Sequence, residues 1–201
     1  MSAIRINFVN FAFKIKDFHL IKKKINMVNH TVNHKTSELI NSLKNKDKIR
    51  ILFVCLGNIC RSPAAEGIMR ETVRRHGDEG NWTIDSAGTG DWHVGDLPDS
   101  RMRAAAAKRG YRLTHRCRQL RASDFEDFDL IIGMDEQNIR NIRLFSPSRE
   151  EWKRVQPISL WLSDDEGTYV PDPYYGTEHD FDRVVSLLES ACSRLYDTLS
   201  E

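Results

Sequence analysis

The chain has 201 residues and lacks any apolar run that approaches the length needed to cross a membrane, which for a helix is about 20 residues. It has only four cysteines, too few for a disulfide framework at this length. Cys55 and Cys60 lie close together, but their spacing is unusual for zinc and no second pair follows. These absences predict a protein of the reducing cytoplasm, with no metal and no stable membrane insertion.

A strong net charge is also lacking, since 30 Lys and Arg stand against 29 Asp and Glu. The charges are unevenly divided, because residues 1–50 hold 11 basic and 3 acidic residues, whereas residues 51–201 hold 19 and 26. An acidic body argues against nucleic acid as the main partner. Residues 1–48 contain no Gly or Pro and fit neither a secretory signal nor a transit peptide. We expect residues 1–48 to be a disordered basic extension or translated sequence upstream of the true start, since Met27 is another possible start. A membrane-surface or regulatory role is the alternative, and a domain is expected over 49–201.

Within the domain, apolar runs alternate with segments of helical pattern. The expected strands and helices, in chain order, are strand 51–55, helix 63–76, strand 81–85, helix 98–109, strand 128–134, helix 135–144, strand 155–160 and helix 179–199. Segments 86–90 and 163–176 read as loops because they are rich in Gly, Pro and Ser. This alternation predicts an α/β fold, a four-stranded parallel sheet flanked by helices on both faces in a Rossmann-like three-layer arrangement.

The segment VCLGNICRSP, residues 54–63, joins the first expected strand to the first expected helix. Cys55 ends the strand, and ligands of open α/β sheets bind beyond the carboxyl ends of strands. Backbone N–H groups of the turn and the positive end of the helix can together cradle an anion. Gly57 and Asn58 tolerate the left-handed backbone that such a cradle requires. Arg61 can clamp two oxygens of a tetrahedral oxyanion with its planar fork.

This cradle predicts nucleophilic chemistry on phosphorus. Cys55 is expected to be a thiolate there, because the helix end, the N–H groups and Arg61 all favour the charged form. Its attack on a phosphate ester would form a phosphocysteine that water then hydrolyses, and the leaving group needs a proton donor. Asp172 in VPDPYYG is the best candidate, because two prolines stiffen the backbone around it. Tyr174 and Tyr175 follow and can wall the mouth of the pocket.

Four segments together, VCLGNICRSP, DSAGTGDWHVG, FDLIIGMDEQN and VPDPYYG, resemble the low-molecular-weight protein tyrosine phosphatase family over residues 49–198. The resemblance implies the phosphotyrosine phosphatase I-like fold and a reaction without cofactor or metal. It implies that Cys55 is the nucleophile, Arg61 the phosphate clamp and Asp172 the general acid. It also implies a phosphate loop with its supporting network, comprising Leu56, Gly57, Asn58, Ile59, Cys60, Ser62, Ser86 and His115. The implied substrate pocket comprises Ile59, Trp92, Tyr174 and Tyr175.

Some of these roles stay open at the level of sequence. Cys60 can trap oxidised Cys55 as a reversible disulfide, or it is a small apolar filler. His115 is either part of the loop network or an ordinary structural histidine. Asp135 can cap the helix that follows it, and it matches a family aspartate that holds groups of the loop by hydrogen bonds.

The expected activity is hydrolysis of phosphotyrosine in a protein substrate by a monomer or weak dimer. Protein-arginine phosphatases of the same fold carry a small polar residue where this chain has Ile59, whereas an apolar Ile59 beside Trp92 favours an aromatic slot. Thioredoxin-linked arsenate reductases need two later cysteines, and residues 127–134 contain none. A non-catalytic phosphate-binding module would have lost Cys55 or Asp172. The nucleotide-hydrolase motif G-x-x-x-x-G-K-[ST] is absent.

Overall fold

The computed structural model describes residues 34–200, so most of the extension predicted for residues 1–48 lies outside the described residues. The chain divides into two compact units, residues 1–38 and 39–201. In the first unit, residues 34–38 are helical. In the second unit, residues 39–44 are helical and Leu43 is buried in the hydrophobic core. The compact second unit therefore begins earlier in the chain than the expected boundary at residue 49.

The centre of the second unit is a four-stranded sheet in the order β2-β1-β3-β4, and every neighbouring pair is parallel. The strands are β1 (Ile49–Cys55), β2 (Trp82–Gly88), β3 (Leu130–Gly133) and β4 (Val155–Pro157). β1 lies in the interior of the sheet and is buried along nearly its whole length, as expected of a parallel strand covered on both faces. The register sets Cys55 level with Gly88 on β2. The predicted four-stranded parallel sheet is confirmed.

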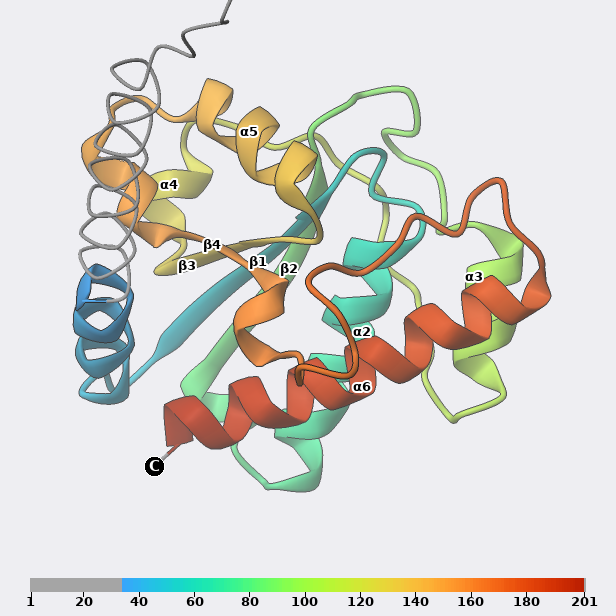
Figure 1. The fold of residues 1–201 in the computed structure, drawn as a ribbon, viewed down its shortest axis with the longest axis horizontal. Helices are drawn as coiled ribbons and strands as arrows, with labels where there is room; N and C mark the ends of the chain where they lie inside the picture. The colour runs from blue at the N-terminus through green and yellow to red at the C-terminus, as the bar shows by residue number, and fades with distance from the viewer. Residues whose placement is uncertain (1–33, 201) are drawn as a thin grey trace, which may run out of the picture. The chain divides into compact units, whose positions relative to one another are not determined.

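Helices cover both faces of the sheet, as Figure 1 shows. The larger core lies on one face with α2 (Arg61–Arg75), α3 (Ser100–Ala107) and α6 (Glu178–Ser200). The smaller core lies on the other face with α4 (Asp124–Asp127) and α5 (Glu136–Phe145). Alternate residues of β1 serve the two cores, since Ile51 and Phe53 pack in the first, and Leu52 and Val54 in the second. In the described part of the chain, no helix combines the length and apolarity needed to cross a membrane.

The structure differs from the expected elements at several places, of which three matter for the site and the sheet. β2 continues through Ser86 to Gly88, which the sequence suggested as loop, because these residues pair with β1. β4 ends at Pro157, and Ile158–Trp161 forms a 3₁₀ helix instead of further strand. Proline has no N–H to donate to a ladder, which accounts for the early end. The single-turn helix α4 was not predicted.

Candidate active site

The loop of residues 56–60 follows β1 at the carboxyl edge of the sheet and leads directly into α2. Cys55, the last residue of β1, is 3% exposed and packs in the larger core. Among the described residues, none caps the start of α2 with a side-chain hydrogen bond, and its first turn carries no acidic residue. The N-terminal N–H groups and positive end of this 15-residue helix are therefore available to an anion beside Cys55.

Asn58 fixes the shape of the loop. Its φ of 55° is left-handed, and its side chain is buried. The side-chain amide donates to Ser62 Oγ and to Ser86 Oγ, each at 2.9 Å. Oδ1 accepts from the Arg118 N–H at 2.9 Å and lies 3.1 Å from His115 Nε2. These four contacts use all of the amide's hydrogen-bonding capacity. They also bring together the residues predicted for the network, which are Asn58, Ser62, Ser86 and His115.

Ser62 connects this network to the sulfur. Its Oγ lies 3.1 Å from Cys55 Sγ and 3.2 Å from the carbonyl oxygen of Ala87. Because Asn58 already donates to Ser62 Oγ, the hydroxyl proton of Ser62 can point only toward the sulfur or toward that carbonyl. Ser62 can therefore donate a hydrogen bond to a charged Cys55.

Behind Ser86 lies a second layer of charged groups. Ser86 Oγ donates to Glu66 Oε2 at 2.7 Å. His115 Nδ1 lies 3.1 Å from Glu66 Oε2 and 3.4 Å from Asp85 Oδ1. Since Nε2 of the same ring faces the Asn58 oxygen, both ring nitrogens of His115 face acceptors. The structure thus places His115 between the loop and two carboxylates.

Glu66, Asp85 and Arg118 were not among the site residues expected from the sequence. Glu66 lies four residues after Ser62, which places both on one face of α2, and a buried carboxylate needs partners. The four-residue spacing from Ser62 was the sequence signal that could have identified Glu66. Arg118 binds Asp85 at 2.9 Å and comes from a distant loop, so nothing local marks it. The Glu66, Asp85 and His115 ligand atoms lie close enough to hold a cation, but Arg118 already balances Asp85.

Arg61, the first residue of α2, is 3% exposed and engages two carboxylates. Nη1 donates to Asp135 Oδ2 at 2.6 Å and to the Val170 carbonyl at 3.3 Å, and Nη2 donates to Asp172 Oδ2 at 2.7 Å. Burial alone would lower the pKa of Arg61, but the charges of Cys55, Asp172 and Asp135 outweigh it and raise the pKa. The guanidinium therefore stays charged beside the sulfur.

Asp135 and Asp172 each have a second anchor that orients them. Asp135 caps α5 by accepting from the Asn138 N–H at 2.7 Å, as predicted for a helix cap. Asp172 accepts from the Tyr174 N–H at 3.2 Å through Oδ1, which leaves Oδ2 to Arg61. The side chain of Asp172 is 44% exposed and that of Asp135 is 25% exposed, so Asp172 is the more accessible to solvent of the two carboxylates that bind Arg61.

The residues expected to form the substrate pocket differ in exposure. Ile59 is half-buried against the larger core, whereas Trp92 is largely exposed. The Trp92 ring lies directly over Gly90, where a Cβ would overlap it. Tyr174 is 37% exposed and meets Tyr175 edge-on with 5.0 Å between ring centres. Tyr175 is 97% exposed, so it stands at the rim instead of lining a wall.

Gly88 allows β2 to approach the loop closely. A Cβ at this position would lie 2.9 Å from the Asn58 nitrogen, the Gly57 carbonyl carbon and the Leu56 oxygen, all of them backbone atoms. A residue that follows Gly88 then bonds to the loop, since the Gly90 N–H donates to the Leu56 oxygen at 2.8 Å. Glycine at the end of β2 therefore permits the contact that holds the loop from one side.

All four cysteines lie among the described residues, and none of them forms a disulfide. Burial, followed by the nearby Cys55, raises the pKa of the Cys60 thiol. Burial also raises the pKa of Cys117 to about 11, and its Sγ donates to the Asn58 carbonyl at 2.8 Å. Cys192 is fully buried in α6, and burial raises its pKa too. These three cysteines therefore remain neutral thiols near pH 7.

A family model described as low molecular weight phosphotyrosine protein phosphatase matches residues 50–201. A low molecular weight phosphotyrosine protein phosphatase of Schizosaccharomyces pombe is 46% identical over 134 residues, covering 66% of this chain and 85% of the relative. The Homo sapiens protein of that name is 36% identical over 142 residues, covering 71% of this chain and 90% of the relative.

Solved structures show the same likeness. A protein tyrosine phosphatase from Entamoeba histolytica with Hepes in the active site superposes with a TM-score of 0.73 at 40% identity, covering 76% of this chain and 97% of that one. The tyrosine phosphatase Wzb from Escherichia coli K30, in complex with sulphate, superposes with a TM-score of 0.66 at 30% identity, covering 75% of this chain and 97% of that one.

Proposed function

The chain belongs to the low-molecular-weight phosphotyrosine protein phosphatase family and is a protein-tyrosine phosphatase, and we propose that it works through a phosphocysteine formed on Cys55. One observation carries this mechanism. Arg61, whose charge interacts with Cys55, donates to the Asp172 carboxylate at 2.7 Å. A nucleophile, a phosphate clamp and a proton donor thus lie at one site, although the donor comes from a different loop.

In the first step, Cys55 Sγ attacks phosphorus as the bond from phosphorus to the tyrosine oxygen breaks. The P–S bond forms, and Asp172 passes its proton to the departing phenolate oxygen. Arg61 and the N-terminal N–H groups of α2 stabilise the charge on the transferring phosphoryl group. Ser62 assists by donating to the sulfur, and Asn58 holds Ser62 in place.

In the second step, the phosphocysteine is hydrolysed. The carboxylate of Asp172 accepts a proton from water as the water oxygen bonds to phosphorus. The P–S bond breaks, inorganic phosphate leaves and the Cys55 thiolate is restored. Charge stabilisation by Arg61 and the helix end is sufficient for both steps, so we propose that the reaction uses no metal and no cofactor.

The surroundings of the loop favour an aromatic phosphate ester over a guanidino phosphate. Ile59 presents an apolar side chain, and Trp92 and Tyr174 stand at the exposed edge of the site. Such surfaces suit the ring of phosphotyrosine, whereas none of these three side chains offers a charge to a guanidino group. We therefore propose a phosphotyrosine-containing protein as the substrate.

We propose further that the catalytic domain comprises residues 49–201 together with the packed residues that precede them from Leu39. We place the protein in the cytoplasm as a monomer or weak dimer. The four cysteines, which are all buried and free of disulfides, are consistent with a reducing compartment.

The proposal is tested by phosphate release from paired phosphotyrosine and phosphoarginine peptides, with the full chain, no added metal, and Cys55→Ser in parallel. Release from phosphotyrosine that is lost in Cys55→Ser is the expected result. A preference for phosphoarginine would keep the mechanism but overturn the argument from Ile59. Equal release by the wild type and Cys55→Ser would overturn the phosphocysteine.

A further inference from the structure

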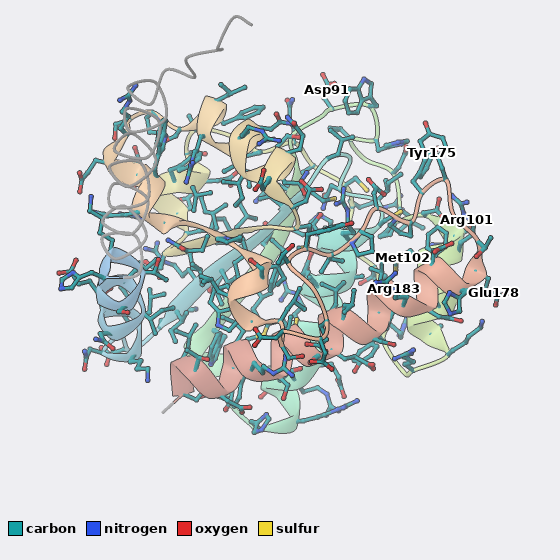
Figure 2. The ribbon with its side chains drawn as sticks, viewed as in Figure 1. Asp91, Arg101, Met102, Tyr175, Glu178 and Arg183 are labelled. Atoms are coloured by element: carbon teal, nitrogen blue, oxygen red, sulfur yellow. The ribbon has the colours of Figure 1, made fainter. Side chains whose placement is uncertain are left out.

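Arg101, in the first turn of α3, faces the loop that carries Asp172. Its guanidinium carbon lies 5.4 Å from the centre of the Tyr174 ring and 4.6 Å from the centre of the Phe181 ring. Figure 2 shows Arg101 between Tyr175 on that loop and Glu178 at the start of α6. A guanidinium within about 6 Å of a ring face is attracted to it, so Arg101 joins the loop to α6.

Asp99 holds Arg101 in this position. The Arg101 guanidinium donates to both carboxylate oxygens of Asp99, at 3.1 and 2.8 Å, in the bidentate fork that only arginine can form. Asp99 also caps α3 by accepting from the Arg101 N–H at 2.8 Å. Its own N–H donates to the Ile59 carbonyl at 2.8 Å. Arg101 is thereby tied to the phosphate loop as well.

The position of Tyr174 in turn affects the orientation of Asp172. The Tyr174 N–H donates to Asp172 Oδ1 at 3.2 Å, and only Pro173 separates the two residues. The Gly176 N–H donates to the Pro173 carbonyl at 2.8 Å and closes the turn. A shift of the Tyr174 ring would therefore move the backbone that orients the Asp172 carboxylate.

We propose that Arg101 is a positioning residue for proton donation: it holds Tyr174, and through Tyr174 it keeps Asp172 aimed at the reacting oxygen. This inference rests on the proposed role of Asp172 as general acid. The end of α3 is joined to α6 without Arg101, because Lys108, the C-cap residue of α3, pairs with Glu178, and Arg109, the next residue, donates to Glu189 at 2.5 Å. Loss of Arg101 should then disturb the loop that carries Asp172 more than it disturbs the fold.

The test measures kcat/KM for a series of aryl phosphates whose leaving phenols span a wide range of pKa. Proton donation matters most for poor leaving groups, and general acids contribute about 10²–10⁴-fold to rates. For Arg101→Met we expect about a tenfold loss with phenyl phosphate and about a twofold loss with p-nitrophenyl phosphate, a part of the full general-acid effect. Arg109→Met is the matched control, because Arg109 lies just after α3 and donates to Glu189 of α6, whereas its hydrogen bonds within the described part of the chain do not include one to Tyr174.

A double-mutant cycle with Tyr174→Ala tests the route of the effect. Arg101→Met should add little to Tyr174→Ala, because the contact it removes is already gone. Full additivity would contradict action through Tyr174. An equal loss for all leaving groups in Arg101→Met, or the same loss in Arg109→Met, would assign Arg101 a merely structural role and overturn the proposal.

Asp172→Asn, measured in the same series, separates this inference from the proposed function. If Asp172→Asn fails to steepen the dependence on the leaving group, the general acid is wrong. If Asp172→Asn steepens it and Arg101→Met does not, only the role of Arg101 fails. Should Arg101→Met not fold, Arg101→Lys replaces it, since Lys keeps the charge but loses the fork to Asp99, and an intermediate steepening is expected.

Discussion

Arg61 Nη2 lies 2.7 Å from Asp172 Oδ2, so the proposed phosphate clamp and the proposed general acid are hydrogen-bonded to each other. The other Nη is held by Asp135 at 2.6 Å. An oxyanion that approaches Arg61 must therefore compete with the Asp172 carboxylate for one of the two donors. While Asp172 is ionised in this pair, its charge also repels a phosphate dianion, and it must take up a proton before it can act as the general acid.

Asp172→Asn should bind oxyanions more tightly while it turns over more slowly. Removal of one negative charge next to the anion is expected to lower the inhibition constant of inorganic phosphate by about three- to tenfold. Inhibition assays with wild type and variant measure this directly. Asp47→Asn, an exposed residue before the start of β1, makes the same charge change elsewhere and should leave the constant unchanged. Weaker phosphate binding in Asp172→Asn would contradict the competition.

Gly88→Ala should damage the phosphate loop. Its Cβ would lie 2.9 Å from three backbone atoms of residues 56–58, so the loop must shift. We expect a loss of about 1–3 kcal/mol in the free energy of unfolding, typical of overpacking, together with a marked fall in kcat/KM. Gly80→Ala is the matched control, because nothing lies within 4 Å of its added Cβ. Urea unfolding and turnover of both variants are the measurements, and equal behaviour of the two would count against the role of Gly88.

Cys60 should protect Cys55 from irreversible oxidation. Burial raises the pKa of Cys60 and keeps it a thiol, which is slow to react with peroxide itself. Oxidised Cys55, as a sulfenic acid, can then condense with the Cys60 thiol to a disulfide and release water. After peroxide treatment, dithiothreitol should restore the wild type and Cys117→Ser but not Cys60→Ser. Full recovery of Cys60→Ser would assign Cys60 to packing alone.

Asp129 should stabilise the fold in a pH-dependent manner. Its buried carboxylate accepts from Lys46 Nζ at 2.8 Å and from Arg50 Nη2 at 2.9 Å. Burial alone would raise the pKa of Asp129, but the hydrogen bonds from Arg50 and Lys46 lower it overall. A carboxyl with a lowered folded-state pKa adds stability above its unfolded pKa of about 3.9, and this stability is lost as pH falls through the folded value.

Asp129→Asn should therefore lower the free energy of unfolding by about 1–3 kcal/mol at pH 7, as expected for charged hydrogen bonds. The gap between variant and wild type should shrink below about pH 4. Denaturant unfolding at a series of pH values is the measurement, with the exposed Glu126→Gln as control. A gap that stays constant across this range would show that the charge of Asp129 contributes nothing.

Local sequence was enough to predict a feature wherever all the residues that form it lie in one continuous segment. The loop from Cys55 to Arg61, its strand and its helix are adjacent in the chain, so glycine, asparagine and the helix start indicate an anion cradle without any tertiary contact. Alternating apolar runs likewise predict the parallel sheet. Asp135 was predicted as a helix cap because a cap depends only on its neighbours.

Contacts between distant segments depended on the tertiary structure. Arg61 meets Asp172 across 111 positions in the chain, and only the tertiary packing of the loop that carries Asp172 brings them together. Ser86 reads as loop in the sequence, yet it lies on β2, because pairing with β1 extends the strand to Gly88. That register sets Ser86 beside Asn58 and Glu66. The sequence by itself therefore determined the reactive loop and the order of the elements, because both follow from neighbouring residues. The parallel register of the strands, and the packing of loops from distant parts of the chain, decided which carboxylates and hydrogen bonds surround Cys55. No local sequence pattern specifies these contacts.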